Sequence, residues 1–376
     1  MFTDFTILDM VLVLGVSQGL FLAISLVVIH KSNQSANSVL AFILLIAAIM
    51  LFGRIAAFRV PASLVWRYGI FADTIIFLFG PFVYLYVRRL VYKETPEYRL
   101  PLWHYTPAVL HIIFFLGSLT FSLEEFQVKY DEGWLKKIFF IIEAGGILSF
   151  WIYGLVLFSF LVNYKKDTKK VVSFMPQMLN FLFLFIVVWL CINLIWMGSF
   201  VSQHFFQIEI PFINYSTLWM LIPVLIYLVG FYSLQQPALF RIENFPKENK
   251  SERERLKPEE RALLCKRLEF YMKNEKIFRQ PDLTLAALAR KLDTSTNNLS
   301  WLLNKVYKSN FYDYINGYRV AQFVEELEKG THVNHTLLAI AMDAGFNSKS
   351  TFNKVFKSLK GTTPSMFVKN YRIQKV

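Results

Sequence analysis

Seven apolar stretches dominate the first 233 residues of this chain, and each is about as long as the roughly 20 residues that a helix needs to cross a bilayer. A single soluble core does not bury so many stretches of this length. They lie at residues 7–29, 36–58, 69–92, 102–122, 136–163, 177–200 and 212–233. The sequence therefore predicts an all-α protein that begins with a polytopic bundle of seven transmembrane helices over residues 1–234.

Lysine and arginine in the short connections indicate the orientation of the predicted spans, because positive charge favours the cytoplasmic side. The connections after the first, third and fifth spans hold nine of these residues, whereas those on the opposite side hold five. We therefore expect the N-terminus outside and the C-terminus in the cytoplasm.

The positive charge of the chain, +13 overall, is concentrated in its last third. From Lys247 onward there are 24 Lys and Arg against 14 Asp and Glu, a net charge of +10. Residues 235–258 carry three prolines and charges of both signs, which is typical of a linker. Residues 259–376 are then expected to be a soluble helical domain, and an anionic membrane surface would attract it.

Within residues 283–364 the sequence repeats itself at an offset of 52 or 53 residues. Each copy reads as a short helix, a tight turn and a second helix whose apolar residues recur at i, i+3, i+4 and i+7. The stripes expected to face the core are Leu299, Leu302, Leu303 and Val306 in the first copy, and Phe352, Val355, Phe356 and Leu359 in the second. The repeat predicts two helix-turn-helix units.

The opposite faces of the two second helices carry amides, hydroxyls and lysines, which are the groups that contact base edges and phosphates in a major groove. The candidate DNA-binding residues of the first unit are Ser295, Asn297, Asn298, Ser300, Trp301, Asn304 and Lys305. Those of the second unit are Ser348, Lys349, Ser350, Asn353, Lys354 and Lys357, with Thr351 on the same expected face. A solvated surface explains any single lysine, but not two copies in matching register.

Two kinds of residue mark the turns of the repeat. Gly345 lies where the turn needs a left-handed backbone, and Asp293 is its nearest equivalent in the first copy. Ser295 and Ser348 stand where a helix N-cap is wanted, a role that does not exclude contact with a phosphate. Between the copies, residues 311–329 predict one helix of roughly 28 Å, so that both second helices could enter successive major-groove faces about 34 Å apart.

One run in the second copy resembles the signature of the AraC/XylS family of bacterial transcription regulators. The run is A-x-x-x-G-F-x-S-x-S-x-F-x-x-x-F-K-x-x-x-G-x-T-P, formed by Ala341, Gly345, Phe346, Ser348, Ser350, Phe352, Phe356, Lys357, Gly361, Thr363 and Pro364. The resemblance covers about residues 265–374. It implies a seven-helix domain with two helix-turn-helix units, and double-stranded promoter DNA and RNA polymerase as partners. Together with the predicted spans, it leads us to expect a bacterial inner (cytoplasmic) membrane as the location.

By this resemblance the base-contacting positions are Asn297, Ser300 and Trp301 in the first unit, and Lys349, Ser350 and Lys354 in the second. Three residues depart from the family pattern. The family usually has Arg where Lys354 stands, so a bidentate contact with guanine is lost. Trp301 could contact a thymine methyl or sugar, or instead pack on the helix between the copies. Val368 replaces an arginine often found after the aromatic at Phe367, which removes a peripheral contact.

Ionisable residues within the predicted spans are the other candidate site, because a charge in lipid is expensive and is usually buried against a partner. They are Asp9, Arg54, Asp73, His111 and Glu143. An Arg54–Asp73 salt bridge is expected from their neighbouring positions at the ends of two spans. These residues either tie helices together or form a polar pocket, open to the outside, for a small-molecule or membrane-borne signal.

Motifs for catalysis are absent from the sequence: there is no phosphate-binding glycine loop, no G-x-S-x-G and no H-E-x-x-H. We therefore expect no catalytic residues, no cofactor and no metal site. The sequence favours a membrane-bound one-component regulator that couples a signal to promoter binding through the linker or through a change in dimerisation. A transporter or membrane enzyme with a DNA-binding tail is the alternative, and the linker would also permit proteolytic release of the tail.

Overall fold

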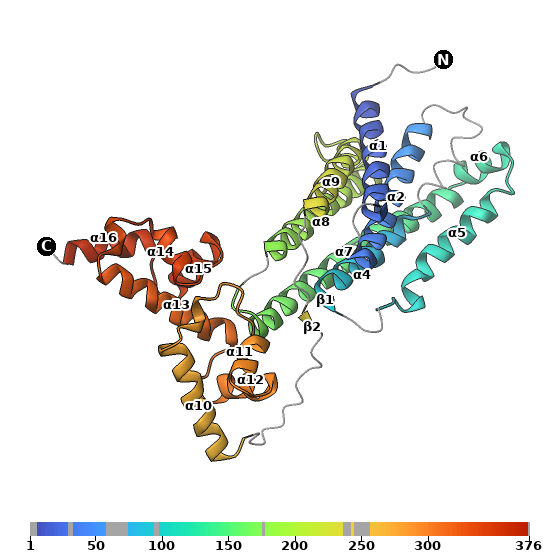
Figure 1. Ribbon diagram of the computed structural model, residues 1–376. Coiled ribbons are helices and arrows are strands. Elements are labelled where there is room, and N and C mark those ends of the chain that lie inside the picture. The colour runs from blue at the N-terminus through green and yellow to red at the C-terminus, as the bar shows by residue number, and fades with distance from the viewer. Residues whose placement is uncertain are drawn as a thin grey trace. The chain divides into compact units, whose positions relative to one another are not determined.

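The computed structural model describes residues 6–28, 33–57, 74–93, 98–174, 177–235, 242–243 and 256–374 (Figure 1). These residues are helical except for turns and two strands of two residues each, β1 (Tyr92–Lys93) and β2 (Ile242–Glu243), which pair in parallel. The expected all-α class is confirmed. The chain divides into two compact units, of which the first comprises Met1–Leu161 with Phe181–Asn244, and the second Val162–Asn180 with Phe245–Val376.

The first unit is built from long apolar helices, coloured blue to yellow in Figure 1. They are α1 (Ile7–Val28), α2 (Gln34–Ala57), α4 (Ile76–Val91), α5 (Thr106–Ser118), α6 (Leu123–Asp131), α7 (Trp134–Val171), α8 (Gln177–Val201) and α9 (Tyr215–Gln235). The short turns η1 (Leu102–Tyr105) and η2 (Ser202–Phe206) precede α5 and follow α8. The division of the chain assigns the end of α7 and the start of α8 to the second unit.

Within the described part of the chain, five helices are long and apolar enough to cross a membrane: α1, α2, α7, α8 and α9. A sixth crossing is obtained if Leu102–Ser118 and Leu123–Asp131 count as one span, although the chain bends by 120° between them. The predicted fourth span at 102–122 is thus interrupted by a bend near its end. The third predicted span, 69–92, is described only from residue 74 onward, where α4 has 16 residues. The count of seven spans stays a prediction.

Small residues allow α1 to pack closely on its neighbours. A β-carbon on Gly15 would lie 2.6 Å from Cγ of Pro223 in α9 and 2.8 Å from Cδ1 of Leu51 in α2. One on Gly19 would lie 3.3 Å from the β-carbon of Ala48. The G-x-x-x-G spacing therefore places both glycines on the packed face of α1, as small-residue motifs do in membrane helices.

The second unit contains shorter helices, drawn in orange to red in Figure 1. They are α10 (Pro258–Lys273), η3 (Ile277–Arg279), α11 (Leu285–Lys291), α12 (Thr296–Lys305), α13 (Phe311–Glu328), η4 (Thr331–Val333), α14 (Leu337–Asp343), α15 (Lys349–Lys360) and α16 (Pro364–Gln374). The linker predicted at 235–258 falls largely outside the described residues. The single helix expected at 311–329 is confirmed as α13.

Two hydrophobic cores form this unit, and α13 contributes to both. Phe311 and Ile315, near its start, pack in a core with α10, α11 and α12. Val320 and Phe323, further along, pack in a second core with α14 and α15. Because one helix carries both cores, it fixes the spacing between the two helix pairs α11–α12 and α14–α15.

Candidate nucleic-acid interface

The two helix pairs share the same local devices at corresponding positions. Thr284 caps α11 and Thr336 caps α14, each by accepting a hydrogen bond from the backbone N–H three residues later. Ser295 caps α12 and Ser348 caps α15 in the same way. Such caps satisfy backbone donors that a helix start otherwise leaves unpaired. The repeat seen in the sequence is therefore also a repeat of helix boundaries.

The turns within the two pairs both require a left-handed residue, as predicted. Asp293 has φ of +55° and Gly345 has φ of +101°. A β-carbon at Gly345 would also lie only 2.5 Å from the carbonyl oxygen of Phe278 and 2.7 Å from Cα of Arg279. Glycine is therefore required at this position for two reasons: the left-handed backbone angle, and the close approach of the second turn to η3.

The apolar stripes of α12 and α15 face the cores, with one exception in each copy. Leu299, Leu302, Leu303, Phe352, Val355 and Phe356 are all buried. The fourth predicted members, Val306 and Leu359, are 42% and 51% exposed. That part of the prediction is wrong. α12 has already ended at Lys305, and Leu359 lies in the last turn of α15, next to its C-cap at Gly361.

The accessible face of α12 carries most of the candidates of the first unit. Asn297, Asn304 and Lys305 are exposed, and Asn298 and Ser300 are partly exposed. The side-chain amide of Asn304 donates to the hydroxyl of Ser300 at 3.4 Å, so these two groups form one polar patch on the helix. Amide and hydroxyl groups held in this way can donate to and accept from base edges.

Trp301 lies on the boundary between this face and the core. Its side chain is partly buried and packs against the first core, to which α13 contributes. Of the two roles left open for Trp301, packing is the one seen in the structure.

The accessible face of α15 is the more basic one. Lys349, Ser350, Asn353, Lys354 and Lys357 are all exposed. Thr351, expected on the same face, is buried, and its hydroxyl accepts a hydrogen bond from the cap Ser348 at 2.9 Å. The helix thus presents three lysines and two neutral polar side chains, a set that suits phosphates and base edges together.

Arg319 of α13 lies at the centre of the second unit and is not among the residues predicted from the sequence. It is 1% exposed, and its guanidinium donates to the carbonyl oxygens of Phe278 and Gln280, both at 2.7 Å. It also donates to the side-chain oxygen of Asn316 at 3.2 Å. Burial lowers the pKa of Arg319 to about 10, opposed by the nearby Tyr312 and Asp282, so the group stays charged at neutral pH.

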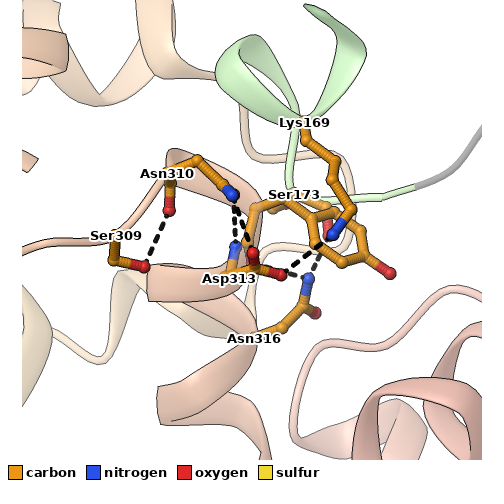
Figure 2. Close-up of polar contacts among 7 residues, drawn as sticks. Lys169, Ser173, Ser309, Asn310, Asp313 and Asn316 are labelled. Atoms are coloured by element: carbon orange, nitrogen blue, oxygen red, sulfur yellow. Dashed lines mark hydrogen bonds and ion pairs between the residues drawn. The ribbon is translucent and has the colours of Figure 1, made fainter. Parts of the chain in front are cut away.

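The remaining partner of Arg319 is Ser173, which belongs to the loop between α7 and α8. The guanidinium donates to the Ser173 carbonyl and to its hydroxyl oxygen, both at 2.9 Å. Asn316 donates to the same carbonyl at 3.0 Å (Figure 2). On its other side, Ser173 donates to the carbonyl of Leu283 through its backbone N–H at 3.2 Å and through its hydroxyl at 2.8 Å.

Two further contacts extend this docking on α13. The ammonium group of Lys169 lies 3.3 Å from the Asp313 carboxylate and 4.9 Å from the centroid of the Tyr312 ring (Figure 2). Val172 forms an antiparallel bridge with Thr284, the cap of α11. We call residues 169–174, which are the last residues of α7 and those that follow it, the docked loop, since they contact both α13 and the first helix pair. The ion pair is partly exposed and contributes little on its own.

The ionisable residues predicted within the spans do not all come together. Arg54, His111 and Glu143 line one cavity of about 420 Å³ in the first unit. Asp9 does not line it; this carboxylate accepts hydrogen bonds from the backbone and hydroxyl of Thr6 and so holds the start of α1. Asp73, and with it the expected salt bridge to Arg54, lies outside the described residues.

Aromatic residues that sequence reasoning passed over complete the polar end of this cavity. The Glu143 carboxylate accepts from the Tyr215 hydroxyl at 2.6 Å and from the Trp196 indole N–H at 2.9 Å. The Arg54 guanidinium lies 5.6 Å from the centroid of the Trp219 ring. Such partners are hard to find in a sequence with so many aromatic residues, because only the fold selects them.

Comparison with protein families identifies the class of the second unit. Residues 288–370 match the family model of a helix-turn-helix domain, a range that takes in most of α11 and all of α12, α14 and α15. The match supports an AraC-type DNA-binding domain and hence a DNA-binding transcription regulator. No curated protein and no solved structure matches the chain.

Proposed function

We propose that this protein is a transcription regulator of a bacterial inner membrane, whose α12 and α15 read promoter DNA in response to a signal received by the membrane helices. In this proposal residues 1–234 form the seven-span sensor with the N-terminus outside, residues 235–258 the linker, and residues 259–376 the cytoplasmic DNA-binding domain. RNA polymerase is the expected partner at the promoter, and a homodimer is one way to occupy repeated sites.

The observation that carries the coupling is the docked loop. Ser173 lies two residues after the end of α7 and precedes α8, and both helices are long and apolar enough to cross a membrane. The same residue is bound to α13 and to the segment before α11. A change in the ends of α7 and α8 therefore acts on the helix that sets the spacing of the two reading helices.

Arg319 makes this spacing sensitive to the loop. When Ser173 leaves, the buried guanidinium loses two acceptors, and each hydrogen bond to a charged group contributes about 1.5–3 kcal/mol. The loop-docked arrangement is then the one that holds α12 and α15 at a fixed distance, as simultaneous insertion into one duplex requires. A signal that binds two membrane arrangements with different affinity would shift the population of the docked state.

The DNA-binding part of the proposal is tested by mapping the chromosomal sites that the intact protein occupies. We expect Lys349→Ala with Lys354→Ala to abolish occupancy, because both lysines lie on the exposed face of α15. The matched control is Lys266→Ala with Lys273→Ala, which removes the same charge from exposed positions of α10. Equal occupancy by both double variants would mean that α15 does not read DNA.

The coupling part is tested by a cross-link between Val172→Cys and Thr284→Cys, after Cys191 and Cys265 have been replaced by alanine. Opposed residues of an antiparallel pair have Cα atoms about 4.5–5.5 Å apart, within the range of about 4.4–6.8 Å that a disulfide needs. We expect oxidation of native membranes to form this bond and to preserve promoter occupancy. The control pair is Lys170→Cys with Thr284→Cys. Equal bonding in both pairs, or no bond in either, would remove the docked loop from the proposal.

A further inference from the structure

The cavity in the first unit is elongated. It is lined by α2 from Leu40 to Arg54 and by α9 from Tyr215 to Val229. Each of these intervals is 14 residues, or about 21 Å at 1.5 Å per residue, which is most of the hydrocarbon thickness of about 30 Å. An extended hydrocarbon chain, whose carbon atoms contact their neighbours at about 4 Å, fits along this length.

The two ends of the cavity differ in chemistry. Arg54 lies in the last turn of α2, Glu143 in the third turn of α7, and Tyr215 begins α9. The opposite end, where α2 and α8 begin and α9 finishes, is lined by Leu40, Phe181 and Val229. A ligand that fits both ends has a polar head and an apolar tail.

The charges at the polar end indicate what kind of head is recognised. The Glu143 carboxylate already accepts two hydrogen bonds, from Tyr215 and Trp196. Arg54 brings a cation to the cavity wall. His111 also lines the cavity and is 4% exposed, and its Nδ1 atom is buried without a hydrogen-bond partner in the structure. An unpaired polar atom at this depth is costly unless something binds it.

We infer that the cavity binds a single-chain amphiphile with an acidic head, such as a long-chain carboxylic acid or a lysophospholipid. The head group lies by Arg54 and His111, and the chain extends toward Leu40 and Val229. The inference rests on the proposed sensing function and gives the signal a chemical class. The head interacts with Arg54 as an acceptor of charge-assisted hydrogen bonds, which are the stronger kind.

The test uses the full-length protein in lipid nanodiscs and palmitic acid carrying a photoreactive diazirine at the end of its chain. After illumination we expect labelled peptides from the apolar end of the cavity, around Leu40 and Val229. Unlabelled palmitate should reduce the labelling if the cavity binds a long-chain carboxylic acid, and 1-palmitoyl lysophosphatidate should reduce it if the cavity binds a lysophospholipid. The stronger competitor shows which of the two head groups is preferred. Label distributed over the lipid-facing residues, or equal competition by dodecylamine, would overturn the inference.

Three variants sharpen the result. Arg54→Gln should weaken competition by palmitate at least about tenfold, the loss expected when a charge-assisted hydrogen bond is removed. Ala47→Phe fills the cavity and should abolish labelling, whereas Leu45→Phe, on an exposed face of the same helix, should leave it unchanged. Unchanged labelling of Ala47→Phe would contradict the inference.

Promoter occupancy, measured on the same preparations, separates this inference from the proposed function. Loss of labelling with intact DNA binding removes only the amphiphile. Specific labelling without DNA binding would support the amphiphile site and contradict the proposed regulatory function.

Discussion

The hydroxyl oxygen of Ser173 and the guanidinium of Arg319 are 2.9 Å apart, although 146 residues separate them in the chain. Both side chains are buried, and the contact joins the loop after α7 to α13 of the DNA-binding unit. Since α13 contributes to the cores of both helix pairs, a change at this one contact is transmitted to both.

Ser173→Ala should destabilise the second unit by about 1–3 kcal/mol, because it removes the hydroxyl that accepts from Arg319 and donates to Leu283. Arg319→Met should cost on the order of 3 kcal/mol or more, since several buried carbonyls lose their donor. The measurement is pulse proteolysis of the second unit across a urea series in the intact protein. The double variant should fall short of the sum of the single effects, because both changes break the same contact. Additive effects would show that the two residues act separately.

Gly345→Ala should unfold or strongly weaken the second helix pair. The substitution places a side chain at φ of +101° and pushes its β-carbon against the backbone of Phe278. Gly317→Ala is the matched control, because Gly317 lies inside α13 with open space at the β-carbon position. It should stabilise the unit by about 0.5–1 kcal/mol. The same proteolysis series reports both effects, and similar behaviour of the two variants would refute the assigned role of Gly345.

Ser348 offers a way to separate helix capping from phosphate contact. Ser348→Ala should cost about 1 kcal/mol of stability through loss of the cap on α15. Ser348→Asp keeps a capping side chain and should restore stability, but its negative charge would repel a nearby phosphate. If the serine touches DNA, the aspartate variant is stable and binds duplex poorly. Normal binding by this variant would limit Ser348 to capping.

Salt should weaken DNA binding steeply, because exposed lysines on α15 release counterions from phosphates. Replacing Lys354 with alanine should reduce the slope of log K against log salt by about 0.9 if this lysine meets one phosphate. Lys273→Ala, on α10, should leave the slope unchanged. Electrophoretic mobility shifts with a mapped site at several salt concentrations measure this slope. An unaltered slope for the Lys354 variant would place this lysine away from the DNA backbone.

The local features of the second unit could be read from the sequence, because short-range chemistry determines them. The left-handed turn at Gly345 and the cap at Ser348 depend on residues close to them in the chain, and the structure confirms both. Val306 was misassigned because a periodic pattern does not show where a helix leaves its core. The packing of Trp301 depends on the first core, whose residues come from several helices, and a sequence pattern does not show it.

The docked loop could not be predicted in the same way. Ser173 is a lone serine after a run of lysines, and its partners lie more than 100 residues away. Arg319 did carry a signal: it stands four residues after Ile315 and four before Phe323, on the buried stripe of α13. A charged residue in that position indicates a buried network, although the stripe alone does not name its acceptor.

The second unit is assembled from two separate stretches of chain, Val162–Asn180 and Phe245–Val376. A protease that cut the backbone in the predicted linker, near Lys250, would therefore not set the DNA-binding helices free. The contacts of Ser173 with Arg319 and Leu283 would still hold the cleaved fragment to the end of α7. Liberation of a diffusible repressor or activator would require release of the docked loop as well as cleavage.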